Sequence, residues 1–140
     1  MFSAVLFGGM GVLSFWSITN IYLWRKNNSQ KASLKYYFWQ INGLWNIINL
    51  IIAIVASIIV GIDTANFNTN DTLQSLQIKI IAANILLDLI YVTIGLILEN
   101  RGKKNTNLRL RGYGESIQLQ GAFLFCFDSM LALGLIITVI

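Results

Sequence analysis

The sequence predicts an all-α protein, a transmembrane four-helix bundle with both termini outside the membrane. Hydrophobic residues make up 56% of its 140 residues and charged residues 11%, and proline is absent. A soluble domain has roughly 45–50% apolar residues. The second observation is four long apolar runs, and the third is the gathering of basic residues beside two of the connections. Since these runs occupy most of the chain, we expect one integral membrane domain over residues 1–140.

Each apolar run has the length of about 20 residues that a helix needs to cross the hydrocarbon core of a bilayer. The first run has no basic residue before it and is longer than the core of a signal peptide, so we expect it to be a retained span. Its small residues predict a face for close helix packing. The predicted spans lie near 2–24, 37–62, 79–98 and 117–140.

Basic residues predict the orientation of the bundle. Nine of the ten lysines and arginines fall in segments 25–35 and 101–111, which follow the first and third spans. Loops on the cytoplasmic side carry the excess of lysine and arginine. We therefore expect both segments in the cytoplasm, and the termini and the 63–78 loop outside, in a multi-pass protein of the cell membrane. Anionic lipid headgroups explain this positive charge better than nucleic acid does.

The third span contains an acidic residue close to its middle. Asp88 lies on one helix face with Asn84 and Tyr91, at steps of four and three residues. A charged carboxylate facing lipid is costly, so this face should point into the bundle. The second span repeats the steps with the amides Asn42, Asn46 and Asn49. The matching stripes predict two helices that face a shared polar interior, although such amides also serve simply to hold membrane helices together.

The fourth span brings a second acidic residue to a similar depth. Asp128, followed by Ser129, lies eleven residues beyond Ile117, and Asp88 lies eleven residues before Glu99. If Ile117 and Glu99 mark the inner surface, both aspartates lie roughly 16 Å from it, near the middle of the bilayer. Gln120 is expected near the cytoplasmic end of this span. The glycines of the preceding Gly-Tyr-Gly segment, residues 112–114, predict a flexible approach to it.

A short similarity between the halves of the chain suggests a repeat. Segments 40–45 and 118–123 share the pattern Gln-x-(Asn/Gln)-Gly-x-(Trp/Phe), and each follows a basic segment. Because each half has two spans, such a repeat would be a parallel one of two helical hairpins. In its register Leu50 is equivalent to Asp128, which makes the acidic residue peculiar to the second half.

Several functional classes lack their chemical groups. The chain has no histidine, so His-based nucleophile systems and proton shuttles are absent, and Cys126 has no second cysteine to pair with. No sequence motif for a metal, a phosphate or a cofactor is present. We therefore expect no enzyme, no catalytic residue, no metal site and no cofactor.

The chain resembles an uncharacterised family of small four-span bacterial membrane proteins. The resemblance rests on the patterns W-N-x-x-N, N-x-x-x-D-x-x-Y and G-Y-G followed by Q-G-x-F-x-x-x-x-D. It implies a bacterial inner-membrane protein without implying an activity. The matching residues are Trp45, Asn46, Asn49, Asn84, Asp88, Tyr91, Gly112, Tyr113, Gly114, Gln120, Gly121, Phe123 and Asp128.

Two functional hypotheses follow from the polar residues inside the spans. In the first, the protein is a proton- or cation-coupled carrier of a small solute, in which Asp88 and Asp128 bind the ion. In the second, it is a non-catalytic membrane adaptor, or a subunit that binds a ligand or partner, and its buried polar network is structural. A bundle this small would act as a homodimer or within a larger membrane complex. The ion- or ligand-binding candidates are Asp88, Asp128, Asn46, Asn49, Asn84, Tyr91, Ser129 and Gln120.

Overall fold

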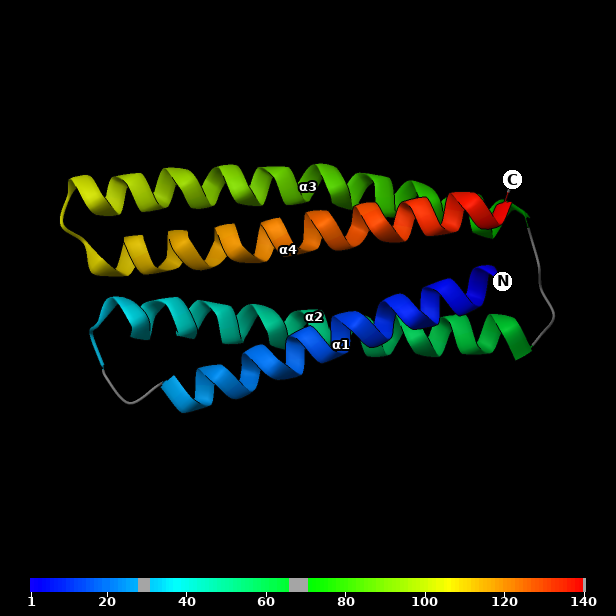
Figure 1. Cartoon of the computed structure of the whole chain (residues 1–140), viewed down its shortest axis with the longest axis horizontal. Helices are drawn as coiled ribbons and strands as arrows, with labels where there is room; N and C mark the ends of the chain where they lie inside the picture. Colours follow the sequence, from blue (N-terminus) through cyan, green and yellow to red (C-terminus); the bar gives the residue numbers. More distant parts are fainter. Residues whose placement is uncertain (28–30, 66–70, 140) are drawn as a thin grey trace.

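The computed structural model describes residues 1–27, 31–65 and 71–139, and in these segments the chain is helical apart from its turns (Figure 1). All four helices are long and apolar enough to cross a membrane. The prediction of an all-helical chain with four candidate spans is therefore confirmed. The helices are α1 (Phe2–Asn27), α2 (Leu34–Ala65), α3 (Asp71–Lys104) and α4 (Leu108–Val139).

The helices extend beyond the apolar runs, so the expected loops at 25–35, 63–78 and 101–111 are wrong in their bounds. Hydropathy marks the residues that suit lipid, whereas a helix continues until a capping residue or a turn stops it. Ser33 Oγ accepts a hydrogen bond of 3.0 Å from Tyr36 N at the start of α2. Asn107 Oδ1 likewise accepts the N–H groups of Arg109 and Leu110 at the start of α4.

The four helices form two hairpins, α1–α2 and α3–α4 (Figure 1). The N-terminus and the C-terminal end of α4 lie at one end of the bundle, and the C-terminal ends of α1 and α3 lie at the other. Helix α4 packs against all three other helices, whereas α3, within the described residues, packs its backbone closely only against α4. The polar faces of α2 and α3 are thus not in direct backbone contact.

Glycines bring α3 and α4 unusually close. A Cβ atom placed on Gly95 would lie 2.7 Å from Gln118 N, and one placed on Gly121 would lie 2.9 Å from Val92 N. Gly102 and Gly114 face backbone atoms of the opposite helix in the same way. The Gly-Tyr-Gly segment belongs to α4, so the flexible approach predicted for it is wrong. Its glycines instead permit close packing, because each removes a side chain from a helix interface.

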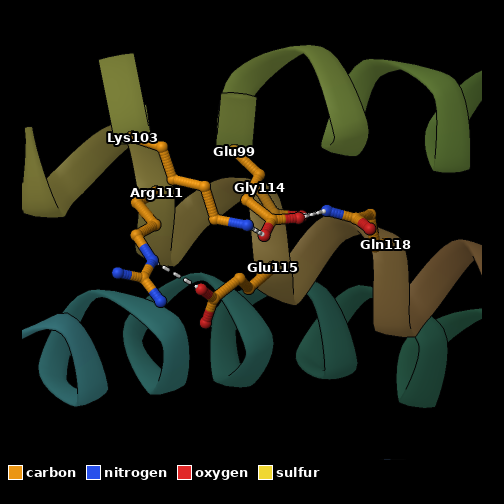
Figure 2. A network of polar contacts seen from close by, with 6 residues as sticks. All are labelled: Glu99, Lys103, Arg111, Gly114, Glu115 and Gln118. Carbon is orange, nitrogen blue, oxygen red and sulfur yellow. Dashed lines mark hydrogen bonds and ion pairs between the residues drawn. The ribbon is translucent and has the colours of Figure 1, made fainter. Parts of the chain in front are cut away.

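Polar side chains join α3 to α4 near the turn (Figure 2). Gln118 Nε2 donates a hydrogen bond to Glu99 Oε2, and Lys103 forms an ion pair with Glu99 one turn along α3. On α4, Arg111 Nε lies 2.8 Å from Glu115 Oε1. Glu99 therefore lies beside Gln118, the neighbour of Ile117, as the comparison of depths from the sequence required.

The interior of the bundle is polar over much of its length, whereas its surface is apolar. Among the described residues, nine hydrophobic and nine polar side chains are buried. Many isoleucines and leucines along α2 and α3 are about half exposed, including Ile52 and Ile80. The buried apolar side chains gather toward the end with the termini, around Leu6, Leu131 and Leu135. Such a distribution suits helices surrounded by lipid, which does not drive apolar residues inward.

Candidate ion- or ligand-binding groove

A groove separates α2 from α3 where their backbones do not touch. Its volume is about 480 Å³, and side chains of all four helices line it. It extends from Trp45 and Tyr91, near the middle of the bundle, toward Val60 and Gln77 at the end with the termini. Isoleucines and leucines form most of its walls. Its polar groups are the side chains of Asn49, Gln77, Asn84, Asp88, Tyr91 and Asp128.

The two intramembrane aspartates meet in this groove. Asp88 on α3 and Asp128 on α4 are only 3% and 7% exposed, both line the groove, and their carboxyl groups lie close enough to interact. Asp88 Oδ2 is fully buried and accepts no hydrogen bond from a donor in the described chain. Two carboxyl groups so close together can form a hydrogen bond only when one of them holds a proton. The arrangement can therefore take up or release a proton, or offer an oxygen to a cation.

The other predicted residues of α2 and α3 take different positions in the groove. Asn49 is 4% exposed, and its Nδ2 has no acceptor within the described chain. Tyr91 is half-buried and packs edge-on against Trp45, with ring centroids 5.1 Å apart. Asn84 lines the groove with Asp88 and Tyr91, as expected of one helix face, but unlike Asp88 it is exposed. The groove is open along α3 at this turn, which places the amide at its margin.

Asn46 and Gln120 belong to a separate cluster, the amide network, between α2 and α4. Gln120 Nε2 donates to Asn42 Oδ1 at 2.8 Å, and Asn46 Nδ2 donates to the same oxygen at 2.7 Å. Trp16 Nε1 of α1 donates to Gln120 Oε1 at 3.3 Å. Asn42 and Asn46 are completely buried. Asn42 Nδ2 and Asn46 Oδ1 are buried without a partner in the described chain. The network lines the groove at no point, and its hydrogen bonds join α1, α2 and α4, which suits a packing role better than a ligand site.

Ser129 belongs to neither group. It is half-buried on α4 and does not line the groove. The aspartate that precedes it takes the groove-facing position, and the next residue along a helix points about 100° away.

A smaller cavity of about 180 Å³ lies beyond the aromatic pair, on the side of the turns. Trp45 and Tyr91 line both spaces, so these two rings separate the groove from the smaller cavity. Gln120 and Ser116 supply its polar groups, and Ser116 Oγ is buried without a hydrogen-bond partner in the described chain.

Trp45, Gln77 and Ser116 were not among the predicted site residues. Trp45 lies four residues before Asn49, and Gln77 lies seven before Asn84, so both follow the stripes already seen in the sequence. Extending the α3 stripe by two turns would have found Gln77, and widening the α2 stripe by one residue would have found Trp45. Ser116 lies beside glycines in a segment interpreted as an approach to the membrane, and no sequence signal marked it.

The predicted residues all lie within the part of the chain that a known family model matches. This model covers residues 12–129, and so includes Asp88, Asp128 and the amide network. The comparisons with curated proteins and with solved structures gave no match. The match agrees with the expected membership of an uncharacterised family. Because it extends over most of the sequence, the chain belongs to the family of unknown function DUF6992.

Proposed function

We propose that this protein is a proton- or cation-coupled carrier of a small solute in the cell membrane of a bacterium. The observation that carries the proposal is the pairing of Asp88 and Asp128 at one end of a groove between membrane-spanning helices. Two acidic residues in this setting are expensive to bury, and intramembrane acids commonly mark ion or proton pathways.

The charge of the pair supports coupling to an ion. With one shared proton, the two carboxyl groups carry a single negative charge, because two adjacent carboxylates repel strongly in a low dielectric. Among the described residues that line the groove there is no lysine or arginine. A second proton or a monovalent cation would therefore neutralise the pair, and the two would compete. Competition of this kind couples the movement of one ion to that of the other.

The orientation that we propose determines which side of the membrane the groove and the smaller cavity each face. With the basic turns in the cytoplasm and both termini outside, the groove extends outward from the middle of the bilayer, and the smaller cavity lies on the inner side. The Trp45–Tyr91 pair separates the two spaces. A carrier needs a barrier of this kind, which opens a central site to one side at a time.

A parallel repeat of the two hairpins is also part of the proposal. In the register that the sequence suggests, Asn42 is equivalent to Gln120, and these residues, 78 positions apart, are directly hydrogen-bonded. Their neighbours Gly43 and Gly121 each face the first helix of their own hairpin, at Trp24 and Val92 respectively. If a twofold axis along the membrane normal relates the two hairpins, equivalent residues close to that axis contact each other, as Asn42 and Gln120 do.

The second candidate function is that of an adaptor, or a binding subunit, whose polar groups are structural. The amide network favours it, since Asn42, Asn46 and Gln120 hydrogen-bond mainly to one another. The aspartates differ from these amides because Asp88 and Asp128 line the groove, whereas Asn42, Asn46 and Gln120 do not. We therefore assign the packing role to the amides and the ion-binding role to the aspartates. A homodimer or a larger membrane complex is compatible with either role.

Proton and potassium fluxes in liposomes test the proposal. The variants are Asp88→Asn, Asp128→Asn and the double replacement, with Glu115→Gln as a control that neutralises an acid outside the groove. We expect flux from the wild type and the control, less from each single variant and none from the double variant. An inactive wild type, together with variants that merely melt earlier, would instead support the structural role.

A further inference from the structure

We infer that the groove between α2 and α3 binds an amphiphilic organic monocation, with its charged group beside Asp88 and Asp128 and its apolar part between the two helices. The inference rests on the proposed function and deepens it, because it names the class of solute that meets the aspartate pair. A proton or an inorganic ion would occupy only the region of the two aspartates, whereas the inferred ligand would fill the whole groove.

Two buried polar atoms beside the groove make no hydrogen bond within the described chain and could bind a ligand. Asp88 Oδ2 and Asn49 Nδ2 are both buried without a partner in the described chain, and both side chains line the groove. Buried polar groups without partners are unusual in native proteins and call for a missing ligand or water. The aspartate oxygen suits a cationic group, and the amide suits a polar substituent beside it.

The walls of the groove suit a large apolar group rather than a small ion. Ile52 on α2 and Ile80 on α3 are typical of its lining, and both are about half exposed. A hard inorganic cation needs oxygen ligands, and most of this lining offers none, so the groove is larger and more apolar than an inorganic-ion site alone requires. The volume of about 480 Å³ lies in the range of roughly 300–1,000 Å³ that holds drug-sized ligands. The rings of Trp45 and Tyr91 at the inner end can also stabilise a cation.

The proposed repeat explains why the groove occurs on only one side of the bundle. The repeat makes α1 equivalent to α3 and α4 equivalent to α2, so the α1–α4 contact should have a counterpart between α3 and α2. Within the described residues α1 does pack against α4, whereas α3 and α2 leave a gap. Shifted by 78 positions, the α1 residues Leu6, Met10 and Leu13 become Asn84, Asp88 and Tyr91. All six residues line the groove, but the first three are buried core residues that form part of its apolar wall, and the second three supply polar groups to it. The second hairpin thus has polar side chains where the first has apolar packing.

Binding of tetraphenylphosphonium to the purified full chain in detergent tests the inference. The control ligand is tetraphenylborate, which has nearly the same shape and the opposite charge. Equilibrium dialysis should show saturable binding of the cation and none of the anion. The Asp88→Asn, Asp128→Asn double variant should lower the affinity for the cation at least about tenfold, since it removes the charge and keeps the shape. Affinity should also fall as the pH is lowered, because protons compete for the pair. Tyr91 is the other titratable side chain among the residues that line the groove.

A second pair of variants tests the position without touching the acids. Ile52→Trp fills the groove, whereas Ile51→Trp adds the same ring to the neighbouring residue, which is 56% exposed and does not line it. Binding should be lost in the first variant and kept in the second. Equal loss or equal retention in both would overturn the inference.

Three further results would also overturn it. The first is saturable binding of the anion. The second is a copurified phospholipid that the cation does not displace. The third is a wild-type dimer that binds no cation and dissociates when Ile52 is replaced by Trp, which would place a second copy of the chain in the groove. Proton flux without binding of the organic cation would support the proposed carrier function and refute the inference that the carrier binds an organic cation. Cation binding without flux would support the inference and refute the carrier.

Discussion

Replacing Gly121 by alanine should loosen the interface between α3 and α4 and disturb Asp88. The added Cβ would lie 2.9 Å from both Val92 N and Val92 Cγ2, and 3.0 Å from Asp88 O. Carbon atoms pack against such neighbours at about 3.5–4.0 Å, so the two helices must move apart by several tenths of an ångström. Overpacking of this kind costs about 1–3 kcal/mol, and here backbone atoms, which move less easily than a side chain tip, receive the new methyl group.

Gly8→Ala on α1 is the matched control, because a Cβ at Gly8 would meet no atom within 4 Å. Alanine favours a helix over glycine by about 1 kcal/mol, and this gain applies to both replacements. The difference between the two variants therefore isolates the helix contact, and we expect Gly121→Ala to be less stable by about 1–3 kcal/mol.

Unfolding of both variants in mixed micelles by increasing mole fractions of SDS, followed by tryptophan fluorescence, measures this difference. Equal stabilities would show that α3 and α4 separate without cost, and the explanation of their close approach would then be wrong. A destabilised Gly121→Ala variant should also lose part of the flux that depends on Asp88, because the new methyl group contacts the carbonyl of that residue.

Three other predictions concern the amide network, the orientation and the turn. Gln120→Met should lower stability by about 1–2 kcal/mol, since Asn42 Oδ1 loses one of its two donors; the same SDS titration measures it, and a smaller loss when Asn42→Leu is already present would confirm the pairing. A cysteine at Asn105, in a chain with Cys126→Ser, should react with a membrane-impermeant maleimide in inverted vesicles but not in intact cells. Labelling of intact cells would reverse the proposed orientation. Glu99→Gln should lower stability by less than about 1 kcal/mol, since its partner Lys103 is half exposed; a larger loss would show that the turn network controls the packing of α3.

Much of the architecture could be predicted because each physical signal acts locally. Apolar runs of sufficient length predicted the four helices that are candidate spans, and the alternating directions of these helices put the ends of α1 and α3 at the same end of the bundle. The expected equal depth of Asp88 and Asp128 also agrees with the structure, since it follows from counting residues along two antiparallel helices.

The predicted neighbours of the aspartates were less accurate, because a polar stripe indicates which face of a helix is buried and not which helix covers it. Asn46 and Asn49 share one stripe, yet Asn49 lines the groove and Asn46 bonds within the amide network. Asn84 shares the stripe of Asp88 and is exposed. The deciding factor is the close approach of α3 to α4, which moves α3 away from α2. Its signal was the row of glycines, whose positions become meaningful only once the two helices are paired.

Within the described residues, α3 packs its backbone closely only against α4, which has a consequence for the order in which the chain assembles. In the membrane protein that we propose, the ribosome delivers α1, α2 and α3 to the bilayer before α4. At that stage α3 has no helix to pack on closely, and Asn42 has no donor from Gln120. The fourth helix supplies both at once. Insertion of the last segment should therefore convert a hairpin and a loose helix into the finished bundle, and a chain that stops before residue 108 should be a substrate for membrane proteases.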